Sequence, residues 1–330
     1  MDRREAESNP PASEPSMNGL IRSLHHVTAT VTDAQQDLDH YAGVLGLRLV
    51  KKTVNFDNHN VYHFYYGNER GAPSTIMTTF PYKGWGVPVG TRGAGQITVT
   101  SFSVPADSLD FWRERLESMS VPWFDAPSPF GEDAIELDDP SGLRLALVGS
   151  ATDDRVPWTT AEVEEAMAIR GVHSVTLSIR SPDASVRFLT DVLGLDVLDQ
   201  RGDRTRVRLG RGGPGHTLEI QEAADAPPAI NGLGTVHHVA MAIGTPEEQL
   251  EVRESLLHLG CRVTDVRDRQ YFKSVYFREP GGVLYEIATL GPGFDVDEEL
   301  ADLGSGLKLP PWEEPHRSEI LTKLPSIRLG

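Results

Sequence analysis

Apolar and polar residues alternate in short segments of the chain, and four of these segments are rich in Val and Thr, as β-strands are. The first and the last of them contain adjacent histidines, in "LHHVTAT" (24–30) and "VHHVAMA" (236–242). The other two begin near Gly95 and His173. The pattern predicts four similar strands, two of which carry the same histidine pair although they lie at opposite ends of the chain.

Two self-matches extend this similarity beyond the strands. "YAGVLGLRLV" (41–50) and "LTDVLGLDVL" (189–198) both indicate a helix end, a Gly just after the helix and an apolar strand. "AIELDDPSGLRLAL" (134–147) and "SVYFREPGGVLYEI" (274–287) both indicate a strand, a turn with an acidic residue, Pro and Gly, and a second strand. The sequence therefore contains four units of one strand, one helix and about three strands. They begin near His25, Gly95, His173 and His237 and end near Phe80, Val148, Gln221 and Thr289.

The units and the segments between them predict the domain organisation. Residues 1–20 are polar and rich in Pro, Ser and Glu, which predicts a disordered tail. Units one and two are expected to form one domain at 21–148, and units three and four a second at 171–290. Between them, 149–170 is a polar linker with a short helical pattern. The segment 291–330 is too rich in Gly and Pro for a domain and is expected to form a strap across the surface.

Composition narrows the partners. The 330 residues carry a formal net charge of −17, which argues against nucleic acid and against anionic membrane surfaces. No apolar run approaches the roughly 20 residues of a membrane span, and the first residues lack the apolar core of a signal peptide. Cys261 is the only cysteine, so no intrachain disulfide can form, and a cytoplasmic protein is expected. The sequence leaves the oligomeric state open, a homo-oligomer included.

The four units resemble the βαβββ modules of the vicinal oxygen chelate superfamily, which includes glyoxalases, bleomycin resistance proteins and extradiol dioxygenases. The resemblance covers about residues 20–330. It implies an α+β fold in which four modules pair into cupped eight-stranded half-barrels. In this superfamily such a cup surrounds a metal ion.

Aligning the units on their shared turns singles out three residues. His26 and His238, the second histidines of the two pairs, occupy equivalent positions. Glu286 lies in the last strand, "LYEIA", where a carboxylate is costly unless it is paired or bound to a metal. Two histidines and one carboxylate are the ligand set of open non-haem Fe(II) sites, with Mn(II) as the next candidate. A single histidine at a strand start is more often a core residue, but three matches at equivalent positions favour a metal site.

Units two and three lack this set. In place of the ligand histidine, unit three has Ser174, and the counterpart in unit two is expected to be Gln96. Unit three keeps an acid, Glu219, in its last strand, where unit two has Ala146. We therefore expect no metal in units two and three, and we expect His173 to be structural.

Three longer motifs narrow the resemblance, namely "VNFDNHNVYHFYYGNERGAPSTIMTTF" (54–80), "DRQYFKSVYFREPGGVLYEIAT" (268–289) and "LGSGLKLPPWEEPHRSEI" (303–320). Together they resemble the ring-cleaving dioxygenases that act on hydroquinones and chlorohydroquinones. The resemblance implies an iron site formed by His26, His238 and Glu286. It further implies roles in catalysis or substrate binding for His25, His237, Thr28, Arg269 and Tyr276. His63, in "VYHFYYG", is expected to line the substrate cleft.

Side-chain alternation supports part of this assignment. Thr28 lies two residues after the first ligand and shares its face of the strand. Tyr276 and Glu286 are about equally far from the turn between their strands, so a tight hairpin places them opposite each other. His25 and His237 are direct neighbours of the ligands, and they reach the same cavity only where the strand bends or begins.

The expected reaction is insertion of O₂ into a hydroquinone-type aromatic diol, alkylated and chlorinated diols included. A para-diol binds one metal through a single oxygen, and the metal makes that hydroxyl more acidic. His25 or His237, with a pKa near neutrality, is expected to move the proton, while Arg269 and Tyr276 hold the substrate oxygens. Three alternatives stay open: a catechol-type extradiol dioxygenase, another metalloenzyme of the superfamily (an isomerase or a thiol transferase), and a non-catalytic protein that binds aromatic compounds.

Overall fold

The structure, a computed structural model, describes residues 17–329. Residues 1–16, which make up most of the predicted disordered tail, lie outside the described residues. The last part of that predicted tail is ordered, because residues 18–20 form a turn and Met17 is buried in the core. The prediction of disorder is therefore wrong for residues 17–20.

The described chain forms four modules, each with one strand, one helix and three strands, as predicted. The first contains β1 (Ile21–Val31), α1 (Ala34–Leu38), β2 (Arg48–Asn55), β3 (Asn58–Gly67) and β4 (Ile76–Pro81). The second contains β5 (Gln96–Pro105), α2 (Leu109–Ser118), β6 (Trp123–Asp125), β7 (Ala134–Asp138) and β8 (Arg144–Ser150). The third contains β9 (Gly171–Ile179), α3 (Pro182–Arg187), β10 (Asp196–Arg201), β11 (Arg204–Arg208) and β12 (Thr217–Glu222). The fourth contains β13 (Thr235–Ile243), α4 (Pro246–His258), β14 (Arg267–Asp268), β15 (Lys273–Arg278) and β16 (Leu284–Thr289).

Short helical segments complete the modules. A π-helical segment follows α1 at Asp39–Val44 and another follows α3 at Phe188–Val192, while a 3-10 turn precedes α2 at Ala106–Ser108. The glycines predicted to follow the helices, Gly46 and Gly194, have φ values of +67° and +68°. This left-handed conformation ends the helix and leads into the next strand, and it favours Gly because Gly has no Cβ.

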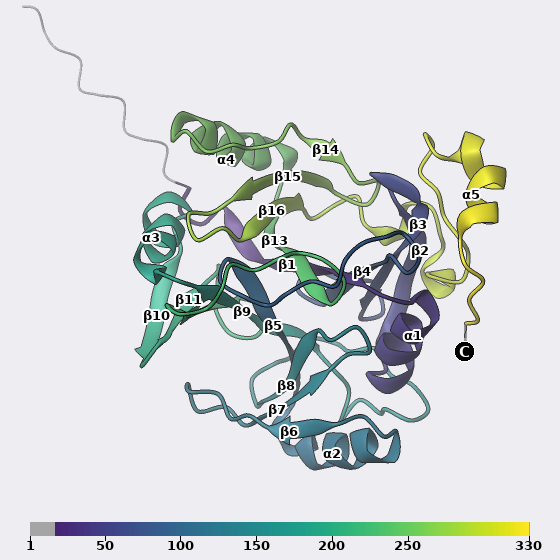
Figure 1. The fold of residues 1–330 in the computed structure, drawn as a ribbon, viewed down its shortest axis with the longest axis horizontal. Helices are drawn as coiled ribbons and strands as arrows, with labels where there is room; N and C mark the ends of the chain where they lie inside the picture. The colour runs from purple at the N-terminus through teal and green to yellow at the C-terminus, as the bar shows by residue number, and fades with distance from the viewer. Residues whose placement is uncertain (1–16, 330) are drawn as a thin grey trace, which may run out of the picture.

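The sixteen strands within residues 17–329 form two eight-stranded sheets (Figure 1). The order is β14-β15-β16-β13-β1-β4-β3-β2 in the first sheet and β10-β11-β12-β9-β5-β8-β7-β6 in the second. The first sheet therefore joins modules one and four, and the second joins modules two and three. The segment 149–170 separates modules two and three along the chain, whereas each sheet takes one module from either side of it. We call the concave sides of the two sheets the first cup and the second cup.

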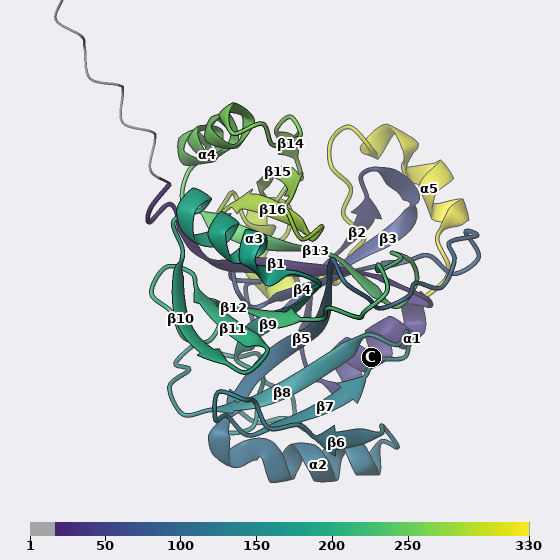
Figure 2. The ribbon, with the colours of Figure 1, turned by 60° about the vertical axis from the view of Figure 1, so that its left-hand side comes forward.

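The core lies between the sheets and the helices, which cover the outside of the molecule (Figures 1 and 2). Helix α2 buries Leu109, Trp112 and Leu116, whose spacing places them on one face of the helix. In β1, the apolar residues at 27, 29 and 31 belong to the same core. Because side chains alternate along a strand, the polar residues between them face the first cup.

The central strand pair of the first sheet, β1 and β13, contains three register shifts, and two of them decide which way the histidines point. Along β1 and β13 the pairing passes from Leu24 with Met241 to His26 with Ala240, so His25 is an extra residue in β1. A second register shift leaves His237 as the extra residue in β13. A bulge places two consecutive residues opposite one partner and re-aims their side chains. The strand bend that the histidine pairs require is therefore present at both pairs.

The segment between the second and third modules differs from its predicted pattern. Residues 149–170, all of which are described, contain no helix. The hydroxyl of Thr160 accepts hydrogen bonds from the backbone N–H groups of Glu162 and Val163, at 3.3 and 3.0 Å. Such a local side-chain turn competes with helix formation. Val163 is buried beside Gly46, so the segment is fixed to the core by this apolar contact.

Residues 291–329 lie beside β2 and β3 (Figure 2). They contain 3-10 turns at Phe294–Val296, Leu300–Asp302 and Glu314–His316 and the helix α5 (Arg317–Lys323). Their acidic residues Asp297 and Glu298 each pair at 2.6 Å with Lys51 of β2, which is fully buried. This segment therefore supports the β2–β3 hairpin. Among the described residues, no helix has the length and apolar character needed to cross a membrane.

Candidate metal centre and substrate cavity

Three buried side chains meet in the first cup. His26 comes from β1, His238 from β13 and Glu286 from β16, and their ligand atoms lie within 4.8 Å of one another. The Nε2 atoms of the two histidines are 3.3 Å apart. Oε2 of Glu286 is 2.8 Å from Nε2 of His238 and 3.4 Å from Nε2 of His26. The structure thus brings together the three residues that the sequence repeat singled out.

The register of the first sheet explains this convergence. One row across the sheet contains, in order, His26, Ala240, Glu286 and Tyr276. Directly paired residues point to the same face of a sheet, so the side chains of this row share the cup. Ala240 has only a methyl group, which leaves space above it for the ligands. The row also confirms the predicted pairing of Tyr276 with Glu286.

The arrangement fits a metal ion better than it fits a set of hydrogen bonds. An ion with bonds of roughly 2.1 Å holds neighbouring ligand atoms roughly 3 Å apart, as these three atoms are. Oε2 of Glu286 is buried, and among residues 17–329 it has no hydrogen-bond partner of acceptable geometry although His238 is close. Its lone pairs and those of the imidazoles are free to meet at a common point.

The charge of Glu286 is consistent with a ligand. Burial opposes its ionisation, but the contacts with His26 and His238 outweigh burial and hold the pKa of this carboxyl well below its usual range. The hydroxyl of Ser274, a fully buried residue of β15, makes a short hydrogen bond to Oε1. Partners of this kind orient metal ligands and tune their basicity. The sequence interpretation did not include Ser274.

The first histidine of each pair hydrogen-bonds to the second. The Nδ1 atoms are 2.9 Å apart between His25 and His26 and 2.8 Å apart between His237 and His238. A ligand that offers Nε2 to a metal carries its proton on Nδ1, so His25 and His237 accept from their neighbours. Burial, and then the neighbouring ligand histidine, lower the pKa of both His25 and His237 to about 3, so the near-neutral pKa expected for these residues is not found.

The two accepting histidines differ in access. His25 is buried behind the ligands, against the ring of Phe272. His237 lines the cavity in front of them and is exposed to it. Because Nδ1 of His237 is used by His238, its Nε2–H is the group that meets a bound molecule. Of the two, only His237 is in position to contact a substrate.

A cavity of about 230 Å³ opens in front of the three ligands. Thr28, His63, Arg269 and Tyr276 line it, as the sequence interpretation placed them. The remaining walls are mainly aromatic, formed by Phe56, Tyr65, Phe80, Tyr82 and Phe272. A few polar groups among aromatic walls are typical of sites for small ring compounds.

Arg269 is held from two sides. Its Nε donates to the hydroxyl of Tyr276 at 3.1 Å, and its Nη2 donates to Asp57 at 3.0 Å. Asp57 comes from the turn between β2 and β3, so this ion pair connects module one with module four across the edge of the cavity. Burial, and then Glu286, raise the pKa of the Tyr276 phenol above its ordinary value. The phenol therefore keeps its proton and can act as a donor.

Three positions of the centre hold His26, His238 and Glu286, and the fourth is the position in module one that is equivalent to Glu286. Thr78 occupies this fourth position. It is paired with Thr28 in module one as Glu286 is paired with Ala240 in module four, so Thr78 is the counterpart of Glu286. Its hydroxyl lies 2.9 Å from both Thr28 Oγ1 and His63 Nε2. With a hydroxyl at this place, module one contributes no anionic ligand at the position equivalent to Glu286.

The model of the glyoxalase/bleomycin resistance protein/dioxygenase superfamily matches residues 23–147 and 171–287. The chain belongs to this superfamily. Within it, relatives that span nearly the whole chain are named as ring-cleaving dioxygenases. MhqO of Bacillus subtilis, named as a ring-cleaving dioxygenase, is 43% identical over 90% of this chain and 94% of its own. The chlorohydroquinone/hydroquinone 1,2-dioxygenase of Sphingobium indicum is 35% identical over 91% and 95%.

Solved structures agree with this membership. The crystal structure of a Bacillus subtilis protein described as a dioxygenase is 41% identical, covers 94% of this chain and 98% of its own, and superposes with a TM-score of 0.89. Glyoxalase I of Zea mays is 18% identical, covers 86% and 96%, and has a TM-score of 0.61. This second likeness shows that the glyoxalase fold is shared. The predicted α+β fold and the predicted enzyme class are both confirmed.

The second cup has a cavity of about 200 Å³ at the place that corresponds to the cluster of His26, His238 and Glu286 in the first cup. The paired residues Ser101 and Ala146 correspond to Ala240 and Glu286, so Val99 takes the place of His238. The predicted counterpart, Gln96, is wrong because it lies three residues before this position. The strand β5 carries no histidine that could anchor the alignment at its start.

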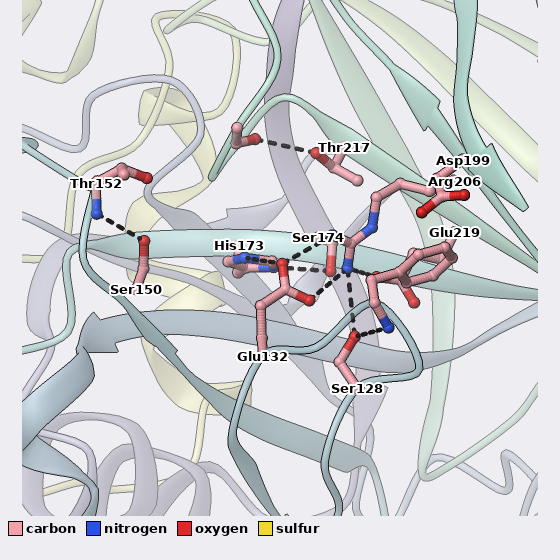
Figure 3. Close-up of polar contacts among 12 residues, drawn as sticks. Ser128, Glu132, Ser150, Thr152, His173, Ser174, Asp199, Arg206, Thr217 and Glu219 are labelled. Carbon is pink, nitrogen blue, oxygen red and sulfur yellow. Dashed lines mark hydrogen bonds and ion pairs between the residues drawn. The ribbon is translucent and has the colours of Figure 1, made fainter. Parts of the chain in front are cut away.

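Charged groups line the second cup (Figure 3). The guanidinium of Arg206 lies between Glu132, which it contacts with two nitrogens at 2.7 Å, and Glu219, also at 2.7 Å. His173 is the bulge residue of β9, and its Nδ1 is 3.1 Å from Ser174 Oγ. Burial lowers the pKa of His173 to about 4. These residues form a closed network of side chains, as expected for a structural His173.

Proposed function

We propose that this protein is a dioxygenase that uses Fe(II), with Mn(II) as the alternative ion, to cleave the ring of hydroquinone-type diols. The ligands are His26, His238 and Glu286. The observation that carries the proposal is the convergence of these three buried side chains beside a hydroxyl, Thr78, at the fourth position of the centre. Relatives that share most of the chain supply the reaction class.

An ion held by His26, His238 and Glu286 would supply Lewis acidity toward a substrate oxygen and redox chemistry toward O₂. The protein supplies the surroundings. Ser274 fixes the carboxylate of Glu286, and His25 and His237 fix the rings of the two ligand histidines. Because Thr78 is neutral, the protein places no second carboxylate at the position that O₂ and the substrate need.

The cavity residues act on the substrate oxygens. Arg269 is positively charged, and Tyr276 is a protonated phenol, so both stabilise negative charge on an oxygen bound beside Glu286. His237 offers Nε2–H from the opposite wall and can donate a hydrogen bond to a substrate oxygen. The aromatic walls exclude water from the ring.

The proposal is tested by loading the protein with Fe(II) without oxygen and then measuring O₂ uptake. Hydroquinone, methylhydroquinone, chlorohydroquinone and catechol are compared side by side, with Mn(II)-loaded protein in parallel. We expect O₂ uptake with the para-diols. Uptake with catechol alone would assign the protein to the catechol-type dioxygenases. Tight binding of the diols without O₂ uptake would contradict the enzyme and favour a binding protein.

A further inference from the structure

The cavity of the first cup contains, at its outer end, a pair of polar side chains that have no role in the reaction proposed above. Asn55 ends β2, and Tyr82 directly follows β4. Both line the cavity. Asn55 is 8% exposed, and its Nδ2 lies 2.8 Å from the hydroxyl oxygen of Tyr82. Neither residue contacts a metal ligand.

Strand geometry places this pair at the far side of the cavity from the metal. Residues 78, 80 and 82 follow one another at alternate positions, and Tyr82 continues the β4 ladder through its backbone bond to Val31. Each such step advances by roughly 6.7 Å along a strand. Thr78 hydrogen-bonds to Thr28, which is paired with His238. Phe80 is one step further along the strand, and Tyr82 is two steps further. An aromatic ring that starts at the metal therefore points its far edge toward Tyr82.

The hydrogen-bond directions at this pair are determined. The carbonyl oxygen of the Asn55 side chain accepts from the backbone N–H of Asp57 at 2.9 Å. Its amide nitrogen must then be the group that faces Tyr82, and it donates to the phenol oxygen. Since the Tyr82 oxygen is an acceptor in this bond, its own proton stays available to donate. Burial raises the pKa of Tyr82, so the phenol remains protonated throughout the neutral range.

We propose that Tyr82, oriented by Asn55, donates a hydrogen bond to the second hydroxyl of a para-diol and thereby selects para-diols over ortho-diols. This proposal rests on the proposed ring-cleaving function. A para-diol carries its second oxygen on the far side of the ring, where Tyr82 lies. An ortho-diol keeps both oxygens at the metal and presents only C–H groups to Tyr82, which leaves the donor without a partner.

The ring between the two ends is held by aromatic side chains. The rings of His63 and Phe80 are 4.2 Å apart, and Phe272 packs against His26 at 5.2 Å. These contacts are apolar and recognise any benzene ring, so they cannot distinguish the two classes of diol. Selection must come from polar groups at the two ends of the ring, and at the outer end the Asn55–Tyr82 pair supplies the donor.

The test compares Y82F and N55D with the wild type, using the Fe(II)-loaded full chain, hydroquinone and catechol. Y82F removes only the hydroxyl. N55D keeps the bond from Asp57 but replaces the donor by an acceptor, which takes the Tyr82 proton away from the substrate. For both variants we expect kcat/KM for hydroquinone to fall about three- to tenfold, mainly through KM, because this contact lies away from the reacting atoms. Values for catechol, or its inhibition constant if it is not turned over, are expected to stay unchanged.

Y62F is the matched control. Tyr62 is also a tyrosine of module one, but its hydroxyl donates to the backbone oxygen of Pro325 outside the cavity. It is expected to leave both substrates unaffected. Anaerobic equilibrium dialysis of hydroquinone and catechol against the same proteins gives a second readout that does not require turnover, and Y82F should weaken hydroquinone binding alone.

The outcomes separate the two proposals. If the wild type consumes no O₂ with hydroquinone, the proposed function fails, and dialysis still decides the role of Tyr82. If the wild type is active but Y82F keeps its kcat/KM for hydroquinone, the para-diol selection is overturned. An equal loss for hydroquinone and catechol also overturns it, since a general structural defect would affect both.

Discussion

The first and second cups consist of equivalent strands in the same order, but their buried acidic side chains have different partners. In the first cup, His26, His238 and Glu286 direct their free electron pairs to one point. In the second, the corresponding positions hold Ser174, Val99 and Ala146 (Figure 3 shows the surroundings of Ser174). Module duplication therefore creates two similar cavities, and the residues at three positions decide whether a cavity can bind an ion.

The second cup contains a cation of its own. Arg206 neutralises Glu132 and Glu219, and although burial opposes ionisation of Glu132, its bonds to Arg206 lower the pKa of that carboxyl. In the first cup, among the described residues, Glu286 has ion pairs with His26 and His238 but with no Lys or Arg. A buried carboxylate needs compensation. The comparison suggests that a metal ion provides in the first cup what Arg206 provides in the second.

The largest effect is expected when one acidic side chain is removed from each cup, which tests whether only the first cup binds a metal ion. E286Q removes a metal ligand, whereas E219Q changes an acid at the corresponding level of the second cup. Since loss of a mere hydrogen-bond partner of a ligand costs roughly 10- to 100-fold, E286Q is expected to lower O₂ uptake by more than about 100-fold and to abolish bound iron. E219Q should keep the iron content of the wild type. Equal iron content in both variants, measured by elemental analysis, would contradict the assignment.

The second prediction concerns the internal cation. R206M removes the two-nitrogen contact of the half-buried Glu132 and leaves the buried Glu219 with Arg204 at 3.3 Å as its remaining cation. Breaking a buried ion pair costs about 3–5 kcal/mol of unfolding free energy. Urea denaturation measures the loss. The triple variant R206M/E132Q/E219Q removes the uncompensated charges as well and is expected to recover most of it. A change below about 1 kcal/mol for R206M would show that the network in Figure 3 behaves as an exposed ion pair.

The sequence was sufficient to single out the three residues that converge in the first cup, because the histidine pair recurs and the carboxylate stands in an apolar strand. His26 and His238 follow the same apolar pattern, and Glu286 is the one carboxylate inside an apolar strand of the last hairpin. The fold followed from the same repeat. The orientation of His25 and His237 could not be predicted, because it depends on two bulges that appear only when β1 and β13 pair.

Residues defined by long-range pairing were missed. Thr78 belongs to a strand in which the sequence showed no ligand, and its role follows from its pairing with Thr28. Asp57 lies in a turn and reaches Arg269 only when modules one and four share a sheet. Gln96 was misassigned because β5 lacks a histidine, so nothing in its sequence marks the bulge position. Contacts of this kind can be predicted only when the pairing register of the strands is known, and composition and local sequence pattern do not give that register.

The third prediction concerns S274A, a substitution that gives the first cup the residue found at the equivalent position of the second cup. Ala134 of β7 is the counterpart of Ser274, since both lie two residues before the residue paired with the last-strand position of Glu286 or Ala146. S274A removes the hydroxyl that holds Oε1 of Glu286. A roughly tenfold weaker affinity for Fe(II) is expected, measured by competition with a chelator under anaerobic conditions. Unchanged affinity would mean that the strand alone positions the carboxylate.

The smallest expected effect concerns pH and a difference between modules one and three. Asp37 of α1 is buried and accepts hydrogen bonds from Tyr66 and Thr79, whereas module three has Ser185 at the equivalent position. Burial raises the pKa of Asp37 from 3.8 to about 8. The folded protein therefore holds this proton more tightly than the unfolded chain, so the free energy of unfolding contributed by Asp37 falls as pH rises from about 4 to about 8. One proton accounts for at most about 1.4 kcal/mol per pH unit.

The variant D37N cannot titrate at this position. Urea denaturation at pH 5, 6 and 7 should therefore show a smaller decline of its unfolding free energy with pH than in the wild type. Parallel pH dependences would show that Asp37 is ionised in the folded protein.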